Sequence, residues 1–507
     1  MPRLHRAQLD TIRRERGDVV DVPDESLLHL PERAVQFGTG ALLRGFVDDF
    51  VHRANADGLF GGRIVAIAST GSARNRALRE QDGLYTLVVE GIERGLPVRE
   101  CRIISSVSRT LSASDEWSDV LALAREPLLD YIFSNTTEVG IVADEDSGAE
   151  DAPPRSFPAK LTRFLFERAR AFEFDQARGL TVIPCELIED NGSRLREIVL
   201  SIARRWELGT TFMEWLENAV PFCNTLVDRI VPGAPRGDDV VRLRAMLGYD
   251  DEMLTTCEPY RLFAIEGNDA LRARLTWAVD AGIVVTPDIA PYRKRKVHLL
   301  NGAHTVLASV ALQMGCELVR EAITQPSLAR YVRHAMMSEI APTLDVKGVE
   351  AFAEAVLDRF RNPHIRHALI DITLQATMKM RVRVVPSIVR YASRTGRVPP
   401  SLAFGFAAFL QYMQGAVQAE RRAKGLPVPA DDQGERLRGY WAGFPEDTHA
   451  SVSELVASVC RDTTLWGTNL DTVPGFVDSV TDQLSGIRSR GVAAALEQYL
   501  MANAHES

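Results

Sequence analysis

The segment KRKVHLLNGAH, residues 294 to 304, gathers three side chains that could do proton chemistry: Lys296, Asn301 and His304. In an α-helix turning about 100° per residue, Asn301 and His304 share a face, and Lys296 lies about 80° around the axis from His304. His298 then points elsewhere. The alternative is structural, in which Lys296 is a solvated lysine of a basic run and His304 is a core histidine.

The chemistry that these residue types suit is the oxidation of a secondary alcohol. That reaction needs a base for the hydroxyl proton while hydride leaves the carbon. A lysine serves as this base if burial and neighbouring positive charge pull its pKa from about 10.4 towards neutrality. An asparagine amide can stabilise the developing alkoxide. His304 would orient the substrate or share the proton. The sequence has no zinc-ligand cluster, so we expect no metal.

A turn with two glycines, FGTGALLR, follows the first expected strand and precedes an expected helix. Gly38 and Gly40 permit a tight turn and a close approach of the backbone to a pyrophosphate, which the N-terminus of the helix would also attract. The full fingerprint has a third small residue where Leu43 stands. An ordinary strand–helix turn is therefore the alternative.

Polar residues also follow other expected strands. The strand GRIVAIAST ends at Ser69 and Thr70, and Arg74 follows. The acidic residue that usually binds the ribose of NAD is missing after this strand, and small polar residues with an arginine can accommodate the 2′-phosphate of NADP. Both NAD and NADP therefore remain candidates. In CELIEDNG, Asn191 is expected on a loop at the carboxyl edge of the sheet, where ligands bind in such folds. The alternative for Asn191 is a plain Asn-Gly turn.

Composition and periodicity define the expected architecture. The chain has 507 residues, of which 46% are hydrophobic and 25% charged, as is ordinary for globular proteins. Strands alternating with helices predict an α/β protein with an N-terminal Rossmann-type doubly wound sheet. From about residue 286 helical periodicity dominates. We therefore expect a dinucleotide-binding domain with an N-terminal extension over 1–285 and a mostly α-helical substrate domain over 286–507.

The same composition argues against several classes of protein. No apolar run reaches the roughly 18 residues that span a bilayer, and the N-terminus lacks the apolar segment of a signal peptide. Six cysteines without a CxxC pair suit a reducing compartment. The net charge of −9 disfavours a nucleic-acid partner. We expect a cytoplasmic protein with neither nucleic-acid nor membrane partners, and leave its oligomeric state open.

Together the motifs resemble the polyol-specific long-chain dehydrogenases, the mannitol dehydrogenase family. The family has a Lys-x4-Asn-x2-His signature, a GxGxxxR turn and an Asn-Gly loop. This chain matches the first with Lys296, Asn301 and His304. It matches the others with Gly38, Gly40 and Arg44, and with Asn191 and Gly192. Two further segments also match: Val227 to Ile230 with Pro232, and Glu258-Pro259 with Ile265 to Gly267.

The resemblance implies metal-independent hydride transfer with NAD, with Lys296 as the acid/base and with Asn191 and Asn301 binding the oxyanion. It also implies a set of cofactor contacts around the turn and the strand ends. These are Phe37, Gly38, Thr39, Gly40, Ala41, Leu42, Leu43, Arg44, Ser69, Asn135 and Thr136.

Within the family, the chain is most similar to members that act on a keto-uronate, although Ala41-Leu42 departs from their usual Asn-Phe. A carboxylate substrate needs arginine or lysine. The segment MKMRVRVVP offers Lys379, the best match to a substrate-binding lysine of the family, then Arg381, with Arg383 nearby. For both arginines a solvated strip is the alternative. Activity on fructuronate or a neutral polyol such as mannitol, and a ligand-binding protein without activity, stay open.

Overall fold

The computed structural model describes residues 1–69, 73–136, 140–142, 146–444, 446 and 448–503. The chain forms two compact units. The first comprises Met1–Gly91 and Pro97–Ile289, and the second comprises Ile92–Leu96 and Ala290–Ser507. The sequence-based boundary at 285/286 falls a few residues before Ile289, and the short Ile92–Leu96 segment was not anticipated in the second unit.

A five-stranded parallel sheet forms the centre of the first unit, with the strand order β5-β2-β1-β6-β7. This is the 3-2-1-4-5 order of dinucleotide-binding folds, which reverses direction between β1 and β6. The predicted doubly wound α/β sheet is confirmed. Its strands are β1 (Glu32–Phe37), β2 (Arg63–Ala68), β5 (Val107–Ser112), β6 (Tyr131–Ser134) and β7 (Thr181–Pro184).

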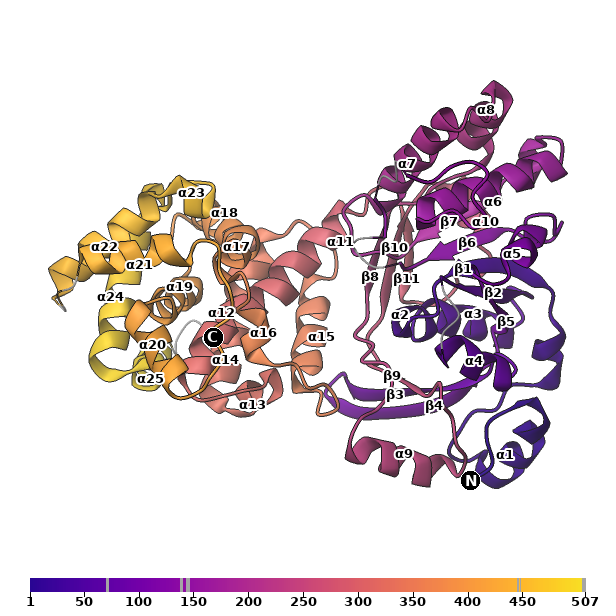
Figure 1. The fold of residues 1–507 in the computed structure, drawn as a ribbon. Coiled ribbons are helices and arrows are strands. Elements are labelled where there is room, and N and C mark those ends of the chain that lie inside the picture. The colour runs from indigo at the N-terminus through magenta and orange to yellow at the C-terminus, as the bar shows by residue number, and fades with distance from the viewer. Residues whose placement is uncertain (70–72, 137–139, 143–145, 445, 447, 504–507) are drawn as a thin grey trace. The chain divides into compact units, whose positions relative to one another are not determined.

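Apolar side chains leave the strands alternately towards two hydrophobic clusters, because successive residues of a strand face opposite sides. Val35 and Phe37 enter one cluster with helices α5 to α8, whereas Ala34 enters the other with α2 and α3. Both faces of the sheet are therefore covered by helices (Figure 1). The helices of this unit are α1 (Leu9–Arg16), α2 (Ala41–Arg44), α3 (Val47–Ala56), α4 (Ala73–Glu80), α5 (Trp117–Leu123), α6 (Phe157–Ala171), α7 (Asn191–Arg205), α8 (Thr210–Ala219), α9 (Asp238–Leu247) and α10 (Asp269–Arg274).

Two smaller sheets complete the first unit. One has the order β4-β3-β9, formed by Leu96–Ile104, Tyr85–Glu93 and Thr255–Cys257. The other has the order β11-β10-β8, formed by Ile283–Thr286, Leu262–Glu266 and Thr225–Asp228. The N-terminal extension packs its apolar residues, among them Leu9 and Ile12, into a cluster with Val88 and Ile103.

The second unit is built almost wholly of helices, coloured orange to yellow in Figure 1. The prediction of a mostly helical C-terminal part is confirmed. Three of its segments are π-helical: η4 (Lys296–Gly302), η5 (Ala335–Ile340) and η7 (Met380–Val384). The α-helices are α11 (Ala290–Arg295), α12 (Ala303–Gln313), α13 (Val319–Thr324), α14 (Pro326–His334), α15 (Val349–Arg361), α16 (Leu369–Ile372), α17 (Ala376–Lys379), α18 (Val385–Thr395), α19 (Pro400–Tyr412), α20 (Gly415–Ala423), α21 (Gly434–Gly443), α22 (His449–Arg461), α23 (Thr463–Trp466), α24 (Phe476–Arg490) and α25 (Val492–Ala502).

A buried carboxylate on α3 joins the parts of the first unit. Asp49 is fully buried and pairs with Arg229, which follows β8, at 2.7 Å and with Arg102 of β4 at 2.8 Å. Burial alone would raise the pKa of Asp49, but Arg229, Arg102 and Arg53 together hold it well below its ordinary range. Such a group is costly to bury unless it is paired and hydrogen-bonded.

We predict that Asp49→Asn destabilises the protein by about 3–5 kcal/mol, because it leaves the buried Arg229 guanidinium without its counter-charge. Urea denaturation measures the loss. The matched control is Asp10→Asn, which removes a largely exposed carboxylate paired with Arg13 at 2.8 Å and should change stability by less than about 1 kcal/mol. Equal stability of the two variants would contradict the structural role of Asp49.

Candidate active site

The glycine turn after β1 requires glycine at its first position. Gly38 has φ +127°, and its backbone N–H donates to the Ile67 carbonyl at 2.9 Å. A Cβ on Gly38 would lie 3.0 Å from the Asn135 carbonyl oxygen and 3.0 Å from Leu43 Cδ1. Leu43 thus packs under the turn, where the dinucleotide fingerprint has a third small residue. Backbone conformation and packing both explain Gly38.

Gly40 has no such explanation within the protein. Its φ of −68° suits any residue, and a Cβ there would meet no described atom within 4 Å. The space beside this backbone is therefore open, at the turn where dinucleotide-binding folds bring a pyrophosphate close. The observation fits a bound dinucleotide, since a ligand would then occupy the space that a side chain at this position would fill.

The helix expected after the turn is divided, which corrects the prediction. Residues Ala41–Arg44 form a helix of only four residues, and α3 begins at Val47. The break occurs at Gly45, where a Cβ would lie 2.7 Å from Val231 Cγ1. The Arg44 guanidinium is buried and donates to the Thr39 carbonyl and, at 3.0 Å, to Thr255 Oγ1. Arg44 therefore fixes the conformation of the glycine turn through hydrogen bonds to the turn backbone and to β9.

A cavity of about 300 Å³ lies at the carboxyl ends of β1, β2, β5 and β6, where the strand order reverses. Open α/β sheets bind ligands at this switch point. Three predicted cofactor contacts line it: Phe37, Ser69 and Thr136. The remaining lining residues, which the sequence did not indicate, are Ile67, Ala113, Gly140, Val142, Arg155, Ser156, Phe157 and Lys160. Thr70 lies outside the described residues.

One sequence signal could have located part of this lining. Ser156 caps α6, accepting a hydrogen bond from the Ala159 N–H at 3.2 Å, and Pro158 lies in the first turn. Serine followed closely by proline is typical of a helix start. Two basic residues of the cavity, Arg155 and Lys160, lie on either side of this cap.

The strand-end residues Asn135 and Thr136 are fixed by the β7–α7 loop. Asn135 Nδ2 donates to the Cys185 carbonyl at 2.8 Å. The Thr136 backbone N–H and hydroxyl donate to the buried Glu186 carboxylate at 2.9 and 3.1 Å. Burial raises the pKa of Glu186, and these hydrogen bonds oppose the rise. The rim of the cavity beside Thr136 is therefore preorganised.

Asn191 is the first residue of α7 rather than a loop residue, which corrects the sequence-based placement. Its side chain is buried, and its amide nitrogen lies within hydrogen-bond distance of Thr225 Oγ1, at 3.0 Å, and of the carbonyls of Pro184 and Glu186, both at 3.1 Å, which share its two N–H donors. Its oxygen accepts from the N–H groups of Gly192 and Thr225, both at 2.9 Å. The side chain ties β7, α7 and β8 together.

The Lys296 segment is a π-helix, so the expected rotation of about 100° per residue does not hold across it. Such segments bond i to i+5 and occur frequently at functional sites. Lys296 and Asn301 are half-buried. Asn301 lies in the π-helical segment, about one turn before His304, which lies in α12. The neighbouring Arg295 is not solvated as the basic run suggested, because it is buried over the Phe352 ring, 4.5 Å from its centroid.

His304 is a buried imidazole with an unused nitrogen. Its ring lies 4.2 Å from the Phe360 ring and 4.7 Å from the His367 ring, measured between centroids. Nε2 has no hydrogen-bond partner among the described residues. Burial lowers the pKa of His304 well below its ordinary value, and the nearby His367, Arg359 and Arg383 lower it further. The imidazole is therefore neutral at pH 7 and suited to hydrogen bonding rather than to carrying a proton.

The two predicted substrate contacts differ in their surroundings. The ammonium of Lys379, at the end of α17, donates to the Ile372 carbonyl at 3.0 Å, and burial lowers its pKa. Arg381 is exposed, donates to the Thr464 carbonyl at 3.5 Å and lies beside Gly467. Lys379 is the better candidate of the two for binding substrate beside His304, because the charge of Arg383 lowers the pKa values of both Lys379 and His304.

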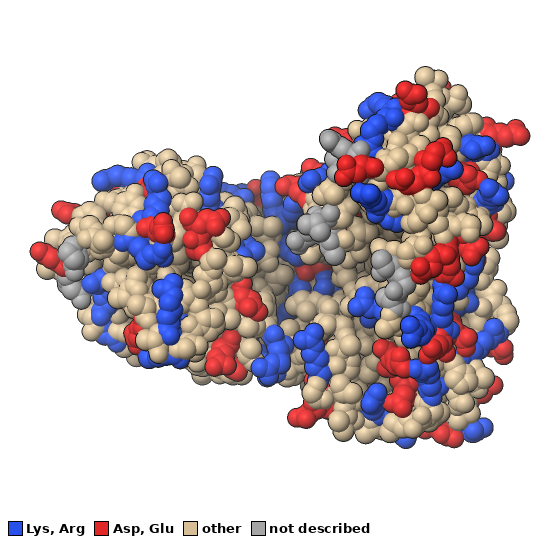
Figure 2. Space-filling model, viewed as in Figure 1, with Lys and Arg blue, Asp and Glu red and all other residues tan. Residues whose placement is uncertain are grey.

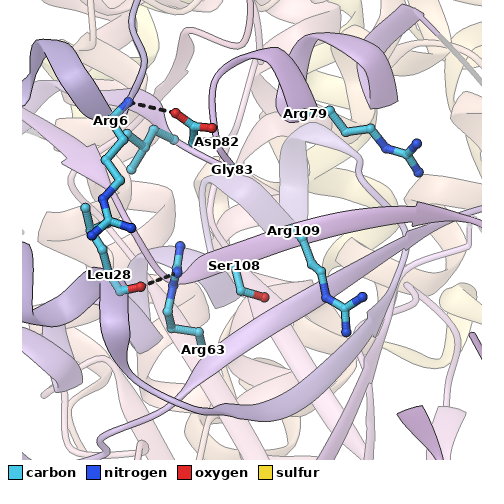
Figure 3. Close-up of a pocket in the computed structure, with 9 residues that line it drawn as sticks. Arg6, Leu28, Arg63, Arg79, Asp82, Gly83, Ser108 and Arg109 are labelled. Atoms are coloured by element: carbon cyan, nitrogen blue, oxygen red, sulfur yellow. Dashed lines mark hydrogen bonds between the residues drawn. The ribbon is translucent and has the colours of Figure 1, made fainter. Parts of the chain in front are cut away.

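A second cavity of about 300 Å³ opens at the amino ends of β2 and β5, on the opposite edge of the sheet from the first (Figure 3). Four arginines line it: Arg6, Arg63, Arg79 and Arg109. Three of them pair with Glu25, Glu116 and Glu32, and Arg63 donates to three backbone carbonyls. These guanidinium groups are already occupied, so the cavity is not a strong candidate site.

Over the described residues, no group of three or more His, Cys, Asp and Glu side chains is arranged to hold a metal ion. All six cysteines are buried and free of disulfides. None of the described helices combines the length and apolarity needed to span a membrane. On the face of the first unit seen in Figure 2, acidic and basic side chains are interspersed.

Sequence profiles of two domains match the chain. That of the mannitol dehydrogenase Rossmann domain matches residues 32–279, and that of the mannitol dehydrogenase C-terminal domain matches residues 288–488. Altronate oxidoreductase from Yersinia pestis is 41% identical over 474 residues, covering 92% of this chain and 97% of that protein. Altronate oxidoreductase from Bacillus subtilis is 39% identical over 475 residues, covering 92% of this chain and 95% of that protein.

Two solved structures share the fold over nearly the whole chain. Mannitol 2-dehydrogenase from Pseudomonas fluorescens, in a ternary complex with NAD and D-mannitol, superposes with a TM-score of 0.66 at 23% identity. It covers 98% of this chain and 99% of its own. A substrate-free D-sorbitol dehydrogenase superposes with a TM-score of 0.75 at 21% identity, covering 98% of this chain and 100% of its own.

We predict that Gly40→Val weakens binding of a nicotinamide dinucleotide by about tenfold or more while leaving thermal stability nearly unchanged. The added side chain meets no described protein atom within 4 Å but would occupy the space assigned to the cofactor. Calorimetric titration and a melting curve measure the two effects. The comparison variant Gly38→Ala should lower the melting temperature, because its φ is +127°. Undiminished dinucleotide binding by Gly40→Val would contradict the placement of the cofactor.

Proposed function

This chain belongs to the mannitol dehydrogenase family, and we propose that it reduces D-tagaturonate to D-altronate with NADH in a reversible reaction. As a family member it is an oxidoreductase that acts on a CH–OH group with a nicotinamide cofactor. The observation that carries the substrate is the similarity to altronate oxidoreductases, about 40% identity across 92% of the chain. The mannitol and sorbitol enzymes share the fold at much lower identity.

In the proposed reaction a nicotinamide held by the first unit would supply hydride to the substrate carbonyl. Lys296 donates a proton to the carbonyl oxygen during reduction and removes it during oxidation. Asn301 donates a hydrogen bond from its amide to the same oxygen, and this bond strengthens as the oxygen gains charge. His304, neutral at pH 7, uses the unpartnered Nε2 to orient a substrate hydroxyl. No metal takes part.

The first unit is proposed to hold NAD. The glycine turn with the open space at Gly40 would receive the pyrophosphate, and the cavity lined by Ser69 and Thr136 would receive other parts of the dinucleotide. NADP is the alternative cofactor, because Arg155 and Lys160 line the same cavity and basic groups can bind a 2′-phosphate. Comparing the kcat/KM of NADH with that of NADPH tests this preference.

We predict that Lys296→Ala lowers kcat by on the order of 10²-fold or more while NADH binding stays within about twofold of wild type. The reason is that the lysine carries the proton, whereas the cofactor is assigned to the first unit. Steady-state kinetics and calorimetry measure the two quantities. A variant with near-normal kcat would show that another group performs the proton transfer.

The two asparagines are predicted to respond differently to alanine substitution. Asn301→Ala should lower kcat more than it raises KM, because its hydrogen bond acts on the transition state. Asn191→Ala should also lower kcat more than it raises KM, and it should lower the melting temperature as well, because the Asn191 amide links β7, α7 and β8. A change in KM alone would remove either residue from the oxyanion role.

We predict that tagaturonate is reduced with a kcat/KM at least about 10²-fold above that of fructose, because a site that pairs a carboxylate leaves its cation unpaired with a neutral substrate. Comparable turnover of fructose would leave only the broader polyol dehydrogenase function.

We also predict that assays in excess EDTA give the same rates as assays without it, because the proposed mechanism uses no metal. If EDTA abolished activity and added zinc restored it, the metal-independent mechanism would be contradicted.

A further inference from the structure

Arg383 carries a half-buried charge without a counter-ion. Its guanidinium makes no hydrogen bond or ion pair with any residue in the described part of the chain. Burial alone lowers the pKa of Arg383, with no nearby carboxylate to oppose the effect. A partly desolvated cation in this state gains free energy when an anion approaches, more than a fully hydrated one would.

The position of Arg383 links it to the proposed catalytic residues of the second unit. It lies on η7, whose backbone contacts η4: the Arg383 carbonyl oxygen lies 2.9 Å from His298 Nδ1, and a Cβ on Gly302 would lie 3.2 Å from that oxygen. The positive charge of its guanidinium lowers the pKa values of both His304 and Lys379. The charge of Arg383 therefore acts on the imidazole assigned to substrate binding.

Neighbouring basic side chains are already bonded to the protein. Lys379 donates to the Ile372 carbonyl at 3.0 Å, and Arg381 donates to the Thr464 carbonyl at 3.5 Å. Arg390 lies 2.7 Å from His298 Nε2 and donates to the Pro386 carbonyl at 3.0 Å. Among these four basic side chains, Arg383 is the one whose charged group has no hydrogen-bond partner in the described part of the chain. Arginine binds carboxylates through two parallel N–H donors.

We infer that Arg383 binds the substrate carboxylate and thereby makes the second unit selective for keto-uronates over neutral ketoses. The inference rests on the proposed function. Lys379 is then left to contact a hydroxyl of the substrate, and Arg381 is left outside the site. This assignment differs from the order expected from the sequence, in which Lys379 came first and Arg381 second.

The test compares Arg383→Met with Arg381→Met, which removes the same charge two residues away on the same π-helical segment. For each variant, kcat/KM is measured with NADH for tagaturonate and for fructose, together with the melting temperature. Arg383→Met should lose on the order of 10²-fold on tagaturonate, mostly through KM, while its rate on fructose stays within about threefold of wild type. Arg381→Met should stay within about threefold on both substrates. Arg383→Lys should recover part of the loss.

The outcomes separate this inference from the proposed function. Wild-type protein that reduces tagaturonate while Arg383→Met keeps its preference over fructose would overturn the role of Arg383 alone. An equal loss on both substrates, or a lowered melting temperature that accounts for the change, would mean that Arg383 is structural and would also overturn it. Wild-type protein that fails to reduce tagaturonate would overturn the proposed substrate and this inference with it.

Discussion

The Asp49 carboxylate lies where water does not reach, and three arginines from separate parts of the chain neutralise it. Arg229 also donates to the Gly45 carbonyl at 2.8 Å, so the same ion pair fixes the end of the glycine turn. Next to it, the Tyr85 hydroxyl oxygen lies 2.8 Å from the Arg44 carbonyl oxygen and 3.0 Å from an Asp48 carboxyl oxygen, and its single hydrogen is shared between these acceptors. Removing the charge would leave the buried Arg229 without its ion pair, whereas Arg102 would keep its pairing with Glu100. The glycine turn, α3 and the smaller sheets therefore depend on one another through the Asp49–Arg229 pair.

In the second unit a related constraint comes from the contact between two π-helical segments. The bond between His298 and the Arg383 carbonyl, together with the close approach at Gly302, fixes η7 against η4. One segment carries Lys296 and Asn301, and the other carries Arg383. The two segments that carry the groups proposed for proton transfer and for carboxylate binding are thus held together by the contact of His298 with the Arg383 carbonyl and by the close approach at Gly302.

Much of the fold could be predicted from local sequence. GRIVAIAST predicted a buried parallel strand, and its strand β2 is buried throughout. The π-helices could not be predicted, because apolar periodicity does not distinguish a π turn from an α turn over seven residues. Neither could the burial of Asp49, since its partners Arg102 and Arg229 lie far away in the sequence. Arg381 and Arg383 look alike in MKMRVRVVP, and only the folded structure separates the exposed side chain from the half-buried one.

The most direct test of the central claim follows the hydride itself. The protein is incubated with tagaturonate and NADH deuterated at both C4 positions, and the product is analysed by mass spectrometry and NMR. The account predicts altronate carrying deuterium on the former carbonyl carbon. Altronate without deuterium, or no altronate while the cofactor is demonstrably bound, would contradict the claim that this chain transfers hydride from a nicotinamide to a keto-uronate.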